Sequence, residues 1–184
     1  MALLAESLVD EWLNRQRFFT VRGVRHGNNE IDLLGVRPQP NGLDAWHVEV
    51  QVSFRPITYI SPVTDEIAKR FPATPKSARK RPSEIVEECA DAWVNAKFMR
   101  DEKRKARNQA WPSLNWNYVF VHGIVREPNE LAAIERMGVR LVAFHQVLAE
   151  LKHSTSKGLR GGAGTDLSEI VEYFSTHGLT PHIN

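Results

Sequence analysis

The chain has 184 residues, with 24 Lys and Arg, 22 Asp and Glu, and a formal net charge of +2 at pH 7. This length fits one domain with a sizeable core. The single cysteine, Cys89, excludes an intrachain disulfide and a multi-cysteine zinc site. No apolar run approaches the roughly 18 residues of a membrane-spanning helix, so we expect a cytoplasmic protein with no membrane partner.

The first half of the chain predicts a helix, three strands and a helical insertion. Residues 3–17 have the apolar spacing of an amphipathic helix, with Glu6 outside the apolar stripe. Extended patterns follow at 19–24, 30–36 and 46–52, and we expect these strands to form an antiparallel meander. A short helix at 64–70 and one long helix over 83–108 belong to a basic helical insertion at about 63–110.

The second half predicts a parallel strand pair. The nearly continuous apolar run at 117–125 is typical of a strand buried on both faces. A helix at 128–137 connects it to a strand at 139–144, and such a crossover makes the two strands parallel. A helix at 145–152 completes a domain over 1–153. A Gly-rich loop from 154 and a helix at 166–178 form a terminal segment, 154–184, that we expect to pack on the same domain. The sequence thus predicts an α/β fold with a mixed central sheet flanked by helices.

Acidic side chains interrupt two of the apolar strands. Asp32 lies in the middle of the second strand, and Glu49 lies two residues before Gln51 on the third, so that Glu49 and Gln51 share one face. Burying a carboxylate without a partner is costly, and a divalent cation is a suitable partner. The alternative is that these acids lie on a solvated sheet edge, where they only discourage edge pairing. His47 shares the face of Glu49 and could touch substrate, but we expect it to be a hydrogen-bonded strand histidine.

Four segments of the chain resemble the PD-(D/E)xK nuclease superfamily, and within it the Holliday-junction resolvases and their small bacterial relatives. The matching segments are Ala5-Glu6-Ser7-Leu8, Phe18-Phe19-Thr20-Val21, Glu30-Ile31-Asp32-Leu33-Leu34 and Val48-Glu49-Val50-Gln51. The resemblance covers about the first 55 residues well and the rest by element order. It implies a restriction-endonuclease-like core.

The resemblance also implies a reaction and its residues. Asp32 and Glu49 would bind Mg²⁺, with Mn²⁺ as a substitute, and Glu6 would orient metal-bound water. Glu30 matches a second acid of the motif and would either bind metal through water or pair with Arg22 or Arg25. The implied activity is that of a metal-dependent endonuclease that hydrolyses phosphodiester bonds in DNA, in repair, recombination, restriction or phage defence.

Gln51 stands where the motif has a lysine, and by the resemblance it would be a catalytic residue that acts with Glu6 to place water at the metal. A neutral amide cannot stabilise developing negative charge as an ammonium does. The alternative function is therefore a catalytically inactive module on the same fold, which binds nucleic acid or another protein.

Basic residues are concentrated in the middle of the chain. Between Lys69 and Arg107, twelve Lys and Arg face six Asp and Glu, so this segment carries +6 and the remainder −4. Such a segment favours binding to the phosphates of DNA. The candidate contacts are Lys76, Arg79, Lys80 and Arg81 in a Pro-rich loop, and Arg100, Lys103, Arg104 and Arg107 on the helix. Helix-dipole stabilisation is an alternative explanation for the helical group alone. A homodimer or a partner subunit would supply specificity.

Overall fold

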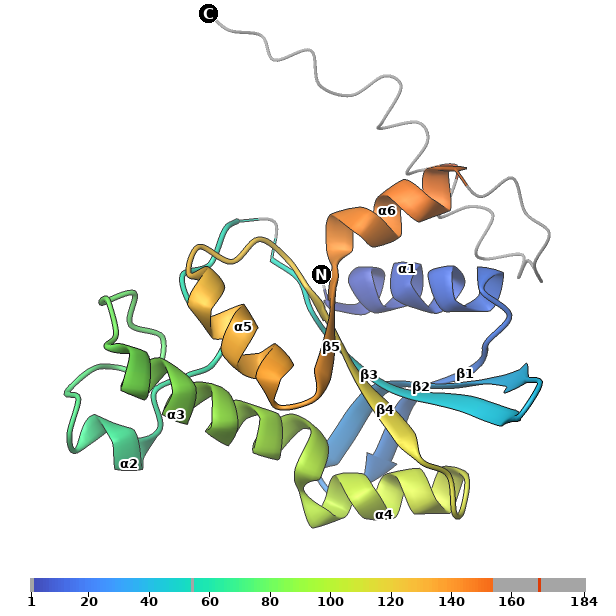
Figure 1. Cartoon of the computed structure of the whole chain (residues 1–184), viewed down its shortest axis with the longest axis horizontal. Helices are drawn as coiled ribbons and strands as arrows, with labels where there is room; N and C mark the ends of the chain where they lie inside the picture. Colours follow the sequence, from blue (N-terminus) through green and yellow to red (C-terminus); the bar gives the residue numbers. More distant parts are fainter. Residues whose placement is uncertain (1, 54, 154–168, 170–184) are drawn as a thin grey trace, which may run out of the picture.

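The computed structural model describes residues 2–53, 55–153 and 169. Within these residues one five-stranded sheet has the order β1-β2-β3-β4-β5 (Figure 1). The strands β1, β2 and β3 are antiparallel, whereas β3, β4 and β5 are parallel. Their bounds are Phe19–His26 for β1, Asn29–Gln39 for β2, Gly42–Gln51 for β3, Trp116–His122 for β4 and Val139–Ala143 for β5. The predicted α/β fold with a mixed sheet is confirmed.

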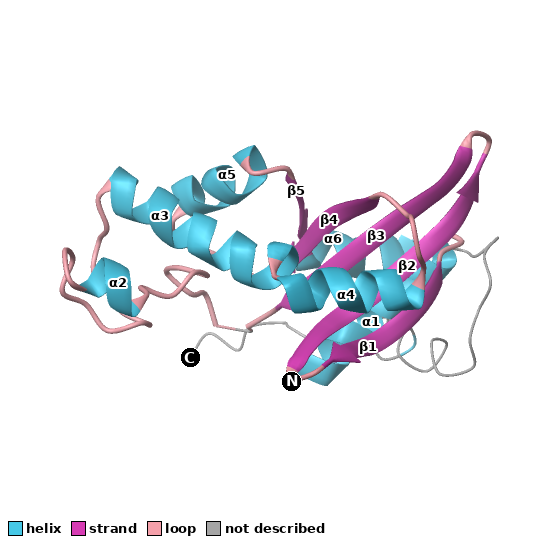
Figure 2. Cartoon of the chain, turned by 90° about the horizontal axis from the view of Figure 1, so that it is seen from below, coloured by secondary structure: helices cyan, strands magenta, loops and turns pink. Residues whose placement is uncertain are grey.

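Helices cover both faces of the sheet (Figure 2). On one face lie α1 (Ala2–Arg15) and α6 (Phe144–His153). The other face carries α3 (Ser83–Val94), the π-helical segment η1 (Asn95–Met99), α4 (Asp101–Ala110) and α5 (Pro128–Arg136). The short α2 (Asp65–Ala68) lies beyond α3, away from the sheet (Figure 1).

The alternation of side chains along β3 divides the core into two layers. Val48 and Val50 pack with Val9 and Leu13 of α1 in one apolar cluster. A second cluster joins α3, η1 and α5 to the opposite face through residues such as Trp93, Phe98, Phe120 and Ile134. Because successive strand residues point to opposite faces, His47 and Glu49 face the layer that contains η1 and α4. Glu49 is therefore covered by helices.

The β2–β3 hairpin is longer than the sequence patterns indicated. Its strands extend to Gln39 and Gly42, and the turn consists of Pro40 and Asn41. Arg37 and Asp44 face each other across this extension, with 2.9 Å between Nη2 and Oδ2. Cross-strand pairs of opposite charge stabilise such ladders. Gly42 at the turn has a φ of +132°, which favours glycine.

The predicted continuous helix over 83–108 is wrong. The chain passes from α3 through the π-helical η1 and then breaks at Arg100, whose backbone is extended at φ −54° and ψ 145°. No Pro or Gly marks this break. A hydrogen bond spans the break, from the Arg107 guanidinium to the carbonyl oxygen of Phe98 at 2.8 Å. The bend turns α4 across the sheet (Figure 2).

The predicted loop at 154–164 and helix at 166–178 lie outside the described residues. In the part of the chain that the structure describes, no helix has the length and apolar character needed to cross a membrane.

Candidate active site

Asp32 lies where the pairing of β2 and β3 ends. The last paired residues of the two strands are Leu33 and Val48. Beyond them the backbone N–H of Val50 donates to Oδ2 of Asp32 at 2.7 Å. The Asp32 carboxylate therefore accepts a hydrogen bond of the kind that a backbone carbonyl of the neighbouring strand accepts within a sheet. Burial and then the negative charge of Glu49 raise the pKa of Asp32 to about 6. The two acids predicted to act together therefore influence each other in the fold.

Glu49 is buried and surrounded by donors. Its side chain is 1% exposed, and Lys97 Nζ lies 2.8 Å from Oε2. Lys103 Nζ lies 2.6 Å from Oε1. Burial alone would raise the pKa of Glu49, but the hydrogen bond from His47 and the charges of the two lysines lower it to about 2. Glu49 is therefore an anion at neutral pH, with each oxygen held by an ammonium.

The two lysines reach Glu49 from different elements. Lys97 belongs to η1 and its side chain is 35% exposed. Lys103 belongs to α4, is 5% exposed, and also donates to the backbone carbonyl of Glu30. π-Helical segments are rare and are often found at functional sites. Here the π-helical turn places a lysine from a helix directly against an acid of the sheet.

His47 supports Glu49 from the same strand. Its Nδ1 lies 2.9 Å from a guanidinium nitrogen of Arg107, and its Nε2 lies 3.1 Å from Oε1 of Glu49. A guanidinium can only donate, so Nδ1 accepts and Nε2 carries the proton that is donated to Glu49. Burial lowers the pKa of His47 to about 4, which keeps the ring neutral at physiological pH. The prediction of a hydrogen-bonded strand histidine is confirmed.

Glu6 of α1 contributes a third negative charge. This charge raises the pKa of Asp32 and also that of the Lys97 ammonium. Burial opposes the charged form of Lys97, and the negative charges of Glu49 and Asp32 outweigh that effect. The charges of Glu49, Asp32 and Glu6 therefore all act on one lysine, and Glu49 is the acid that Lys97 contacts directly. Gln51 is half-buried on the same face of β3 as Glu49, two residues further along.

The donor chemistry of the acids is compatible with a hard divalent cation. Mg²⁺ is usually held by one or two carboxylates and completes its octahedron with water and substrate oxygens. Asp32 and Glu49 supply two carboxylates from neighbouring strands. Among the described residues no group of three or more His, Cys, Asp or Glu is placed to hold a metal on its own. A cation here would depend on these two acids and on solvent.

Glu30, the second acid of the motif, points elsewhere. Its Oε2 accepts from Arg25 Nε at 2.6 Å, and both side chains are exposed. This is one of the two roles that the sequence left open for it. Its backbone carbonyl, rather than its carboxylate, contacts the site through Lys103.

Five of the predicted DNA contacts are exposed, and three are not. Lys76, Arg79, Lys80, Arg100 and Arg104 lie on the surface. Arg81, Lys103 and Arg107 are 5%, 4% and 5% exposed and hold internal partners. Arg81 donates to the Ser61 carbonyl, Lys103 binds Glu49, and Arg107 binds His47. The burial and the internal partners of these three side chains do not support the prediction that they bind phosphate.

The spacing of apolar residues on α3 could have indicated that Lys97 faces the interior. Ala90, Trp93 and Val94 are buried at helical spacing on α3, and Lys97 continues that stripe. A cation on the apolar stripe of a helix requires an internal anion. Lys103 and Arg107 flank Ala106 in the same manner on α4, where the three form the buried stripe.

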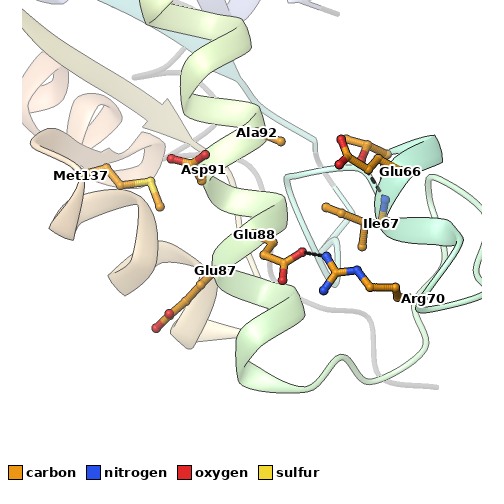
Figure 3. A pocket seen from close by; sticks show the side chains of 9 residues that line it. Glu66, Ile67, Arg70, Glu87, Glu88, Asp91, Ala92 and Met137 are labelled. Carbon is orange, nitrogen blue, oxygen red and sulfur yellow. Dashed lines mark hydrogen bonds and ion pairs between the residues drawn. The ribbon is translucent and has the colours of Figure 1, made fainter.

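A separate cavity of about 460 Å³ lies between α2, α3 and the end of α5 (Figure 3). Its charged lining consists of Glu66, Glu87, Glu88, Asp91 and Arg70, which is four carboxylates against one guanidinium. Arg70 reaches across to Glu88, as the dashed line in Figure 3 marks. None of the residues that line it belongs to the Asp32–Glu49 site. Its negative lining disfavours a polyanion.

Comparison with known proteins gives a structural likeness but no family. No family model matches the chain, and no curated protein matches it. The crystal structure of AF1548, a protein of unknown function, is similar with a TM-score of 0.43 and 14% sequence identity. The match covers 77% of this chain and 58% of that one, so this chain spans less than two thirds of its length.

Proposed function

We propose that the chain is a Mg²⁺-dependent endonuclease acting on DNA, in which Mn²⁺ can replace Mg²⁺. The observation that carries this proposal is the pair of acids on neighbouring strands, half-buried Asp32 and buried Glu49, with the ammonium of Lys97 against Glu49. A helix, an antiparallel three-strand unit, a helical segment and a parallel strand-helix-strand unit follow in that order. This order supports a restriction-endonuclease-like core, and the protein would act in repair, recombination, restriction or phage defence.

In this proposal Asp32 and Glu49 hold the cation. A bound divalent cation supplies a more acidic water and offsets charge on phosphate oxygens. The hydrogen bond from Val50 fixes one oxygen of Asp32, and His47 with Lys103 fixes one oxygen of Glu49. The remaining oxygens of the two carboxylates are then positioned by the protein before any ligand arrives.

Lys97 takes the part that Gln51 cannot perform. An ammonium next to the acids can stabilise negative charge on an attacking hydroxide or on the phosphate. Lys97 is partly exposed, and it lies 2.8 Å from Glu49. The cationic group thus comes from the π-helical turn η1 instead of from β3. Glu6, whose charge acts on both Asp32 and Lys97, is suited to accept a hydrogen bond from water at the site.

Exposed cations on the helical segment would bind the DNA backbone. Lys76, Arg79 and Lys80 lie on the loop before α3, and Arg100 and Arg104 lie at the start of α4. Cations at these positions neutralise phosphates without reading sequence. Recognition of a particular DNA structure would then come from a homodimer or from a partner subunit.

A nicking assay on supercoiled plasmid DNA tests the proposal. We expect the native chain to cut in Mg²⁺ or Mn²⁺ and to stop in EDTA. Asp32→Ala, Glu49→Gln and Lys97→Ala should each abolish cutting. The matched controls are Glu135→Gln and Lys105→Ala, which change an exposed acid and an exposed lysine. Cutting by Asp32→Ala at the native rate would refute the proposal.

The second candidate is an inactive module that binds nucleic acid or protein. The saturation of both Glu49 oxygens by lysines favours it, because a carboxylate held in this way needs no metal. The variant Gln51→Lys separates the two candidates. If only Gln51→Lys cuts plasmid DNA and the native chain does not, the second candidate is correct.

A further inference from the structure

The two oxygens of Glu49 have partners of different kinds. Oε1 accepts from Lys103 at 2.6 Å and from His47 at 3.1 Å. Oε2 accepts from Lys97 at 2.8 Å. Lys103 is 5% exposed and also donates to the Glu30 carbonyl, whereas Lys97 is 35% exposed. One oxygen is therefore held by interior groups, and the other is held by a lysine that reaches solvent.

The two lysines differ in how readily they can leave. Removing Lys103 from Glu49 would leave a buried ammonium without its anion, which is costly. Lys97 has a flexible four-carbon stem and a strongly hydrated head, so water can replace Glu49 as its partner. The ammonium at Oε2 is therefore the exchangeable one.

We propose that Lys97 is an exchangeable internal cation that occupies the coordination position of a single divalent metal ion on Glu49. When the metal binds Oε2 of Glu49 together with Asp32, the Lys97 ammonium leaves that oxygen and becomes available to a phosphate. Lys103 stays on Oε1. This inference rests on the proposed nuclease function. It adds that one metal ion binds per chain and that this ion competes with the Lys97 ammonium for Oε2 of Glu49.

The charge balance around the site agrees with an exchange. Glu6, Asp32 and Glu49 carry three negative charges. Lys97, Lys103 and the Arg107 guanidinium beside His47 carry three positive charges, and His47 is neutral, so the charges balance before a metal binds. A metal ion and an ammonium on the same carboxylate oxygen would repel each other at short range. Release of Lys97 removes this repulsion and places a positive charge beside the metal site.

Direct measurement of Mn²⁺ binding without DNA tests the inference. Isothermal titration calorimetry and electron paramagnetic resonance count bound Mn²⁺ at constant pH. We expect one Mn²⁺ per native chain. Lys97→Met, which keeps a similar stem without the charge, should bind Mn²⁺ roughly tenfold more tightly because the competing ammonium is gone. Lys97→Ala should behave in the same way. Lys105→Met, an exposed lysine on the following helix, should bind like the native chain.

The outcomes distinguish this inference from the nuclease proposal. Mn²⁺ affinity that is unchanged or weaker in both Lys97 variants overturns the exchange, whatever the nicking assay shows. Two Mn²⁺ ions per chain would also overturn it. Tighter binding in the Lys97 variants, combined with a native chain that never cuts DNA, would support the exchange and refute the nuclease. Circular dichroism of each variant verifies that it is folded before titration.

Discussion

The ammonium of Lys97 lies 2.8 Å from Oε2 of Glu49, although the two residues are 48 positions apart in the chain. One belongs to a π-helical turn between two helices, and the other to a strand in the middle of the sheet. This ion pair joins the helical segment to the strands that carry the acids. In the proposed nuclease, Lys97 would also supply the cationic group that the sequence of β3 lacks.

Removal of the Lys97 charge should abolish catalysis while the fold is retained. Lys97→Ala is expected to lower the rate of plasmid nicking by roughly 100-fold or more, as loss of a group that stabilises transition-state charge does. Its effect should appear in kcat at saturating DNA. Lys105→Ala should leave the rate unchanged. Native kcat in Lys97→Ala would remove this residue from the mechanism.

Asp32 should make stability depend on pH. Its pKa in the folded chain, about 6, is raised from the ordinary 3.8, so folding favours the protonated form. That stabilisation is fully present below about pH 3.8 and is lost as the pH rises through 6. Asp32→Asn, which cannot ionise, should therefore be more stable than the native chain at pH 8, by about 2 to 3 kcal/mol.

The same comparison at pH 4 provides the control for Asp32. Glu49 and His47 contribute to the pH dependence of the free energy of unfolding in both proteins. Their contributions largely cancel when the native chain is compared with Asp32→Asn. Urea unfolding in EDTA should show the advantage of Asp32→Asn shrinking as the pH falls from 8 to 4. An advantage that stays constant over this range would show that ionisation of Asp32 is not its cause.

Most of the fold could be predicted from the sequence because its strands are apolar and its turns are marked. The interruption of such strands by Asp32 and Glu49 also indicated the two acids of the candidate site. The break at Arg100 could not be predicted because no Pro or Gly marks it in the sequence. No strand pattern could show that Lys97 lies against Glu49, because that contact depends on how η1 packs on the sheet.

Lys103 should act as a structural residue and not as a phosphate contact. Lys103→Met removes a buried partner of Glu49 and is expected to lower the free energy of unfolding by about 3 to 5 kcal/mol. Lys105→Met, two residues along on the exposed side, should change it by less than about 0.5 kcal/mol. Urea denaturation measures both. Equal stability of the two variants would contradict the role assigned to the Lys103–Glu49 pair.

The exposed loop cations should determine the salt dependence of DNA binding. Replacement of Lys76, Arg79 and Lys80 by Ala is expected to weaken binding and to reduce the slope of log K against log salt by about 0.9 for each phosphate that is no longer neutralised. Fluorescence anisotropy with a labelled duplex measures this slope. Lys152→Ala, an exposed lysine on α6 across the sheet, is the control and should leave the slope unchanged. An unchanged slope in the loop variant would exclude this loop from the DNA interface.

The anomalous diffraction of a native crystal soaked in Mn²⁺ would show whether Asp32 and Glu49 share one ion. We expect one anomalous peak within bonding distance of both carboxylates, with the Lys97 ammonium withdrawn from Oε2. A soaked crystal in which solvent reaches the site, no peak is present and Lys97 still binds Glu49 would contradict the metal site. The acids would then be part of a structural ion-pair network.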